Sequence, residues 1–143
     1  SEHLAIAIPV VSLILSIPLI LTYTAHAIAR FFDSEMPEYK TVIYAYLPLV
    51  LAGNLAHYLP SAMTEAGQIL SVTARTFGFT GAGLPTLTWS LDVAQFLQGV
   101  TLLLILGFSI FPLLKITRRP LVKTIPHLVL MVGMVAVWYE LLI

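Results

Sequence analysis

Histidines draw attention first in this chain, because an imidazole can bind a metal ion or exchange a proton near neutral pH. His26 comes one turn before Arg30, and His127 comes one turn after Lys123, so both lie near the ends of long uncharged stretches at a similar depth. Two imidazoles from different helices can hold a haem iron between them, with Arg30 or Lys123 neutralising the propionates. The alternative is that both rings lie among lipid headgroups and hold no ligand.

A second group of polar residues lies toward the opposite end of the same stretches. Asn54 and His57 are three residues apart and share one helical face. Gln95 and Gln98 repeat this spacing, and Glu140 lies at a comparable level. An imidazole, a carboxylate and amide donors suit a quinone, whose carbonyl oxygens need donors and whose reduction needs protons. The alternative is that the amides only bond neighbouring helices together.

The stretches that carry these residues are long and apolar enough to cross a bilayer. Of the 143 residues, 59% are hydrophobic and only 10% are charged, which is far from the composition of a soluble domain. Each stretch reaches the length of about 20 residues that a spanning helix needs. We therefore expect a single all-α integral membrane domain, a four-helix bundle whose partners are membrane lipid and other membrane subunits. The spans are expected at about residues 4–30, 41–60, 92–115 and 124–143.

The connection between the second and third spans is expected to have structure of its own. Residues 61–76 place apolar groups on one side of a short helix, with Ser61 as its N-cap, and this amphipathic helix would lie along the outer interface. Residues 77–85 form a glycine-rich turn, after which Ser90 or Asp92 caps the third span. The connection would cover the outer end of the bundle.

Charge sets the expected orientation and excludes some partners. Six of the seven Lys and Arg residues lie next to the two short connections, and only Arg75 lies on the long one. By the positive-inside rule, the short connections face the cytoplasm and both termini face outside. A formal net charge of +0 gives no reason to expect nucleic acid. With zero cysteines, the chain cannot hold a thiolate-bound iron–sulfur cluster itself.

Two segments carry a family resemblance: YAYLPLVLAGNLAHYL at residues 44–59 and LQGVTLLLILGFSIFPLLKITRR at residues 97–119. They resemble the C-terminal membrane region of bacterial membrane-bound polyferredoxins, and His57 occupies the matching histidine. Asn54 departs from the second histidine of some relatives, and the cysteine-rich modules are missing. The resemblance implies electron transfer between a redox partner and the quinone pool of the bacterial inner membrane. An iron–sulfur or cytochrome subunit, or another region of a longer protein, would then carry the clusters.

The sequence therefore predicts a non-catalytic or quinone-reactive membrane subunit of a redox complex. In one version a quinone binds at the outer residues Asn54, His57, Gln95, Gln98 and Glu140. In the other, His26 and His127 are the axial ligands of a haem b. The alternative from a different functional class is a structural anchor or assembly subunit without any cofactor.

Overall fold

The regular elements of the chain are helices throughout the part that the computed structural model describes, which is residues 2–80, 83–86 and 88–143. Within these residues, four helical segments are long and apolar enough to cross a membrane. The all-α membrane class is therefore confirmed. In chain order the elements are α1 (Glu2–Phe32), α2 (Tyr39–Val42), the 3-10 helix η1 (Ile43–Tyr46), α3 (Leu47–Gly67), α4 (Ile69–Thr76), α5 (Leu91–Thr117), the 3-10 helix η2 (Leu121–Thr124) and α6 (Ile125–Leu142).

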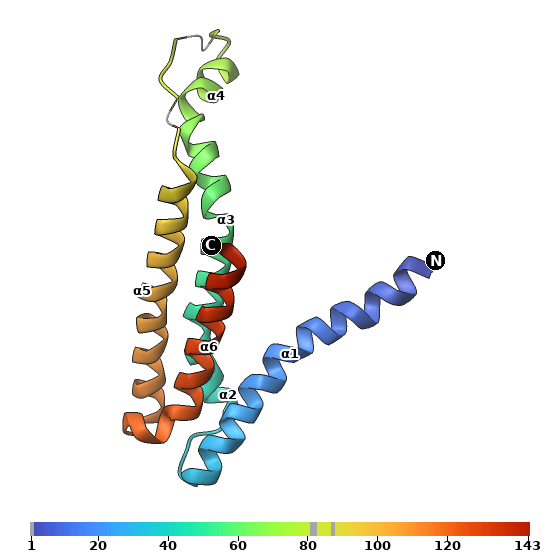
Figure 1. The fold of residues 1–143 in the computed structure, drawn as a ribbon, viewed down its shortest axis with the longest axis vertical. Helices are drawn as coiled ribbons and strands as arrows, with labels where there is room; N and C mark the ends of the chain where they lie inside the picture. The colour runs from blue at the N-terminus through green and yellow to red at the C-terminus, as the bar shows by residue number, and fades with distance from the viewer. Residues whose placement is uncertain (1, 81–82, 87) are drawn as a thin grey trace.

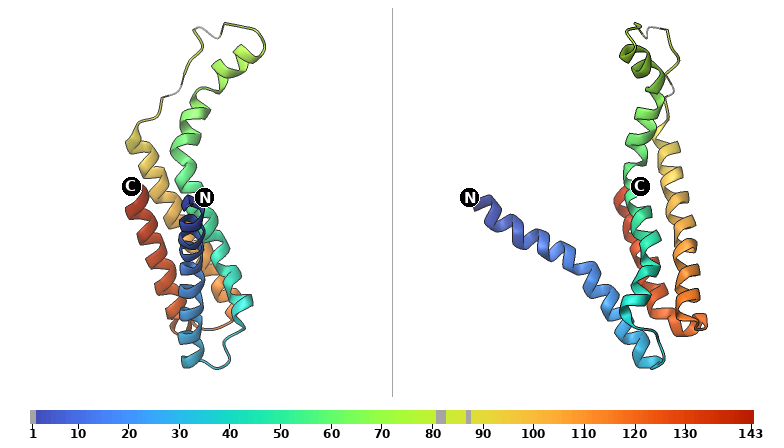
Figure 2. Two further views of the ribbon diagram at one scale, coloured as in Figure 1. Left: turned by 90° about the vertical axis from the view of Figure 1, so that its right-hand side faces the viewer. Right: turned by 180° about the vertical axis from the view of Figure 1, so that it is seen from behind.

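The long helices α3, α5 and α6 lie side by side, whereas α1 leaves them at an angle (Figure 1, Figure 2). The side chains from Ile6 to Leu21 are exposed, apart from the half-buried Ser16, and burial begins only at Thr22. From residue 6 onward, where its side chains are described, α1 therefore packs on the rest of the chain through its C-terminal part. Closure of all four spans into one bundle stays a prediction.

The core lies between α3, α5 and α6, where Leu102, Leu113 and Met131 are fully buried. α6 comes very close to α3 at Gly53, because a Cβ at this position would lie 2.6 Å from the Trp138 ring. Small residues allow membrane helices to approach in this way, and helix association in lipid depends on such close packing. This contact fixes Trp138 against α3.

The outer connection differs from the expected helix over residues 61–76. α3 continues without a break through Pro60 to Gly67, so Ser61 lies inside a helix and does not cap one. Only the eight residues of α4 form a separate helix. A side chain from α5 replaces the hydrogen bond that Pro60 cannot make, so the proline does not end α3. The placement of α4 along the membrane interface stays a prediction.

The remaining features of this connection agree more closely with what the sequence predicts. Gly78 and Gly83 have φ angles of +82° and +86°, which L residues with a side chain rarely adopt. Gly81 of the expected turn lies outside the described residues. Ser90 is the N-cap of α5, since its hydroxyl accepts a hydrogen bond from the Val93 amide at 3.4 Å, and Asp92 lies in the first turn. The predicted cap at Ser90 is confirmed.

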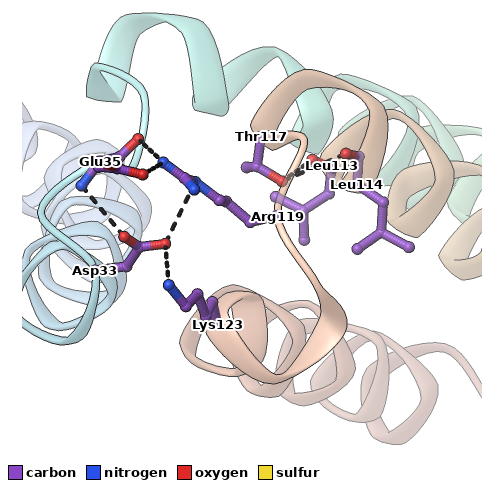
Figure 3. A network of polar contacts seen from close by, with 7 residues as sticks. All are labelled: Asp33, Glu35, Leu113, Leu114, Thr117, Arg119 and Lys123. Atoms are coloured by element: carbon purple, nitrogen blue, oxygen red, sulfur yellow. Dashed lines mark hydrogen bonds and ion pairs between the residues drawn. The ribbon is translucent and has the colours of Figure 1, made fainter.

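The two short connections meet at one end of the molecule, called here the inner end (Figure 3). The guanidinium of Arg119 forms ion pairs with Asp33, at 3.4 Å from Nε to Oδ2, and with Glu35. The Lys123 ammonium lies 3.3 Å from the same Asp33 oxygen. These contacts join the end of α1 to the turn between α5 and α6, so they fix the C-terminal part of α1 beside the start of α6.

The ion pairs around Asp33 lower its pKa. Burial by the surrounding chain is the largest single effect and raises the pKa, but three interactions together outweigh it. They are the hydrogen bond from the Glu35 amide and the positive charges of Lys123 and Arg119, and they bring the pKa below its ordinary value of 3.8. The folded state therefore favours the carboxylate.

This lowered pKa predicts how stability depends on pH. The unfolded chain takes up a proton near the ordinary pKa of Asp33, before the folded chain does, so the stabilisation is complete above that pH and is lost as the pH falls through the folded-state pKa. We expect the difference in Tm between wild type and Asp33→Asn in detergent to be constant at higher pH and to shrink below about pH 4. Glu35→Gln, which removes an exposed partner, should change Tm little. A pH-independent effect of Asp33→Asn would contradict this account.

Candidate functional site

His26 of α1 and His127 of α6 lie against each other near the inner end. Their ring centroids are 5.6 Å apart and the ring planes are tilted by 48°. His26 is 3% exposed and His127 is 0% exposed. The structure thus brings together the two histidines that the sequence placed at one depth, and it buries both. Their role as ligands stays a prediction.

Three of the four ring nitrogens in this histidine pair have no hydrogen-bond partner among the residues that the structure describes. They are Nδ1 and Nε2 of His26 and Nε2 of His127, and all three are buried. Buried polar atoms are nearly always paired, and an unpaired one costs about 1–3 kcal/mol. The fourth nitrogen, Nδ1 of His127, lies 2.8 Å from the hydroxyl oxygen of Tyr46. The histidine pair therefore combines burial with three imidazole nitrogens that have no partner among the described residues.

Two tyrosines complete the surroundings of the pair. Tyr46 is buried and its ring lies 5.9 Å from that of His127. The Tyr39 ring lies 5.6 Å from His26, and its hydroxyl is 2.7 Å from the Thr22 hydroxyl. Sequence reasoning did not include these tyrosines in the site. Their spacing of seven residues, about two helical turns, is the signal that would have placed them on one face.

Pro48 determines the local backbone that carries Tyr46. Proline lacks an amide hydrogen and is tolerated in the first turn of a helix, where no acceptor is needed. α3 accordingly begins at Leu47 with Pro48 in its first turn, and the preceding residues wind as the 3-10 helix η1. Tyr46 is the last residue of η1, and it points into the protein beside α6.

The available ligands fit a group that takes one imidazole from each of two helices. A structural zinc site needs four protein ligands and a catalytic one three, whereas the described residues contain no cluster of three or more His, Cys, Asp or Glu side chains. A haem iron accepts two axial imidazoles. If His127 binds through Nε2, its Nδ1 carries the proton and donates to Tyr46, which fixes the tautomer and the ring orientation. The donor set therefore fits a haem.

The basic residues expected to accompany a haem lie at the same end. Arg30 is exposed one turn beyond His26, and Lys123 is half exposed one turn before His127. Lys123 already pairs with Asp33, so Arg30 is the cation of these two that remains without an ion pair among the described residues.

The outer residues are not gathered into one site. Asn54 and His57 are exposed on α3, and the Asn54 amide donates to a carbonyl of its own helix at 3.0 Å. Glu140 is exposed on α6. Gln95 donates to the backbone carbonyl of Ile143 at 3.0 Å. Their assignment to a quinone site stays a prediction.

Gln98 has a structural role in joining α5 to α3. It is buried, and its side-chain amide donates to the carbonyl of Ala56 at 2.8 Å. In an α-helix this carbonyl accepts from the amide four residues later, which is Pro60 and has no hydrogen to donate. Gln98 supplies the missing donor, which the hydrocarbon of a membrane cannot. The structure therefore favours an interhelical bond at Gln98.

Replacing Gln98 by leucine is expected to destabilise the packing of α3 on α5. The Ala56 carbonyl would be left buried without a donor, at a cost of about 1–3 kcal/mol. Unfolding in detergent measures this loss. The double variant Gln98→Leu/Pro60→Ala restores a backbone amide at position 60 and should recover much of the stability. Failure of this rescue would contradict the explanation.

Comparison of the chain with protein-family models, curated proteins and solved structures finds no match. The resemblance to membrane-bound polyferredoxins therefore stays an expectation.

Proposed function

We propose that this chain is a membrane subunit of a redox complex that exchanges electrons with the quinone pool, and that His26 and His127 hold a b-type haem. One observation carries the proposal: the ring centroids of two imidazoles from different helices lie 5.6 Å apart, and three of their buried nitrogens have no partner within the described part of the chain. A bound haem would supply one-electron transfer inside the membrane.

The surrounding residues position the two ligands. With a haem bound through Nε2 of His127, the Tyr46 hydroxyl oxygen would accept a hydrogen bond from the Nδ1–H of that ring, as the outer partners of metal-binding histidines commonly do. Tyr39 packs beside His26 and is itself held by the Thr22 hydroxyl. Arg30 lies at the inner end, where its positive charge would neutralise the haem propionates.

The outer polar residues form the second part of the proposal. Asn54 and His57 face outward from α3, so a neighbouring subunit can complete a quinone pocket over them. Gln95 and Glu140 lie at the same end, where Glu140 would pass protons to the outer surface. Gln98 holds α3 to α5 beside this surface.

The proposed setting is the bacterial inner membrane, with both termini outside. Six of the seven basic residues lie at the inner end, which supports a cytoplasmic location for that end. In the assembled complex the four spans would form one bundle, and α4 would lie along the outer interface.

Activity of the purified complex tests the proposal. We expect His127→Ala to lose quinol-linked electron transfer while the complex still assembles, because the proposed electron carrier would be absent. Val129→Ala changes an exposed residue of the same helix and should retain activity. His57→Ala tests the outer pocket separately. If the activity of His127→Ala equals that of wild type, the inner pair has no redox role.

A structural anchor is the second candidate, and the exposed part of α1 favours it. The apolar side chains from Ile6 to Leu21 are left for lipid or for another subunit to cover. For a pure anchor, activity in each variant would simply follow the amount of assembled complex. Loss of activity at full assembly in His127→Ala would therefore exclude this candidate.

A further inference from the structure

A polar pocket lies in the outer connection, with walls from two separate parts of the chain. Gln68 and Arg75 belong to the wall formed by the end of α3 and by α4. Thr86, Thr88 and Trp89, from the segment that leads into α5, belong to the other wall. The volume is about 380 Å³, within the range of about 300–1,000 Å³ that is usual for ligand sites. α4 and the last turns of α3 extend beyond the outer end of α6, so the pocket lies away from the core (Figure 1, Figure 2).

Arg75 gives this pocket a positive charge. Of the seven Lys and Arg residues, it alone lies on the long connection. It is exposed in the last turn of α4, and it takes part in none of the ion pairs found among the described residues. The described lining residues include no Asp or Glu, since Glu65 lines a neighbouring groove instead. The pocket is therefore suited to an anion.

The other polar groups of the pocket indicate what kind of anion fits. The hydroxyls of Thr64 and Ser71 already donate to carbonyls of their own helical segment, both at 2.9 Å. The amide of Gln68 and the hydroxyls of Thr86 and Thr88 add donors from both walls. A tetrahedral phosphate directs its oxygens to several sides and can accept from both walls, whereas the two oxygens of a carboxylate lie in one plane. The donors therefore favour a phosphate group.

A second groove, more apolar than the pocket, shares Gln68 and Val72 with it. The volume of this groove is about 480 Å³, and Ala62, Ala66 and Ile69 complete its apolar lining. A molecule with its phosphate in the polar pocket would thus have an apolar surface within reach for an acyl chain. With α4 along the membrane interface, as proposed above, a lipid would supply both groups.

We propose that the polar pocket binds a phosphate group, with the Arg75 guanidinium as its main contact. The planar fork of an arginine can donate two parallel hydrogen bonds to two phosphate oxygens. Gln68 from one wall and Thr88 from the other would donate to the remaining oxygens. Lipid headgroups and free phosphate both carry this group, and the apolar groove favours the lipid. The site is independent of the histidine pair, which lies near the inner end.

The experiment measures the binding of three probes to the purified protein in a non-ionic detergent. The probes are a short-chain phosphatidic acid, the diacylglycerol with the same acyl chains but no phosphate, and inorganic phosphate. Trp89 lines the pocket, so its fluorescence reports binding there, and Trp89→Phe should abolish the signal. We expect wild type to bind phosphatidic acid, and Arg75→Gln to raise the Kd by about tenfold or more.

Three further variants make the comparison specific. Arg75→Lys keeps the charge but loses the fork, so its Kd should be intermediate. Thr88→Val removes a donor from the wall opposite α4 and should weaken binding without changing that helix. Arg118→Gln removes an exposed arginine from the turn after α5, at the inner end, and should match wild type.

The source of the phosphate and the role of Arg75 are separated by the outcomes. If inorganic phosphate binds as tightly as phosphatidic acid and equally depends on Arg75, the site stands and its ligand is a free phosphate. Equal Kd values for phosphatidic acid in wild type, Arg75→Gln and Thr88→Val would overturn the proposal. Equally tight binding of the diacylglycerol would also overturn it. Weaker binding in Arg75→Gln alone, with a loss of helix content by circular dichroism, would mean that Arg75 only stabilises the end of α4.

Discussion

The His127→Ala variant of the purified complex is expected to lose its b-type absorbance band while its helices remain assembled. The substitution removes one of the two imidazoles proposed to hold the iron, and it leaves Tyr46 without the partner that lies 2.8 Å from its hydroxyl. His26→Ala should give the same spectrum, because either substitution leaves only one of the two axial imidazoles that the proposed b-type band requires.

Two controls make this comparison specific. His57→Ala removes an exposed histidine of α3 and should keep the full band. Val129→Ala alters an exposed position of α6, two residues from His127, and should also keep it. A full band in either His26→Ala or His127→Ala would rule out that residue as an axial ligand.

Tyr46→Phe is expected to weaken haem binding by about 10- to 100-fold, the usual effect of removing a hydrogen-bond partner from a metal-binding histidine. Phenylalanine keeps the aromatic packing on His127 but cannot accept a hydrogen bond from Nδ1–H, so the imidazole loses its fixed tautomer and orientation. Haem titration of the apoprotein measures the change in Kd.

Tyr44→Phe is the matched control for this prediction. Tyr44 belongs to the same 3-10 helix but is exposed, and loss of its hydroxyl should not affect the Kd. Equal affinities for wild type and Tyr46→Phe would show that Tyr46 does not orient a ligand.

The sequence predicted those features that depend on local pattern. Uncharged runs of about 20 residues located the four membrane helices, because lipid requires such lengths whatever the helices pack against. Ser90 was identified as a cap because an N-cap is a local interaction. The similar depth of His26 and His127 followed from their equal distance from neighbouring basic residues, whereas the contact between their rings is a finding of the structure.

Features that depend on contacts between distant residues were not predictable in this way. α3 extends past Pro60 to Gly67 because Gln98, from another helix, pairs with the carbonyl that the proline leaves free. No local signal at Ser61 reveals that compensation. The site role of Tyr46 likewise depends on a hydrogen bond to a residue 81 positions away.

The outer polar residues show a second limit of prediction from sequence. Helical spacing correctly placed Asn54 and His57 on one face of α3, but it could not say which way that face points. The buried positions Ala52, Gly53 and Ala56 face α5 and α6, so the polar face is left exposed. Helical period fixes relative positions around a helix, whereas its rotation is set by the neighbours it packs on.

The most direct test of the haem proposal is a visible spectrum of the purified wild-type protein with its partners, recorded oxidised and then after dithionite reduction. If His26 and His127 are axial ligands, the reduced spectrum will show a b-type α-band, with haem present in proportion to this chain. A reduced spectrum without any haem band would contradict the proposed role of the inner histidine pair.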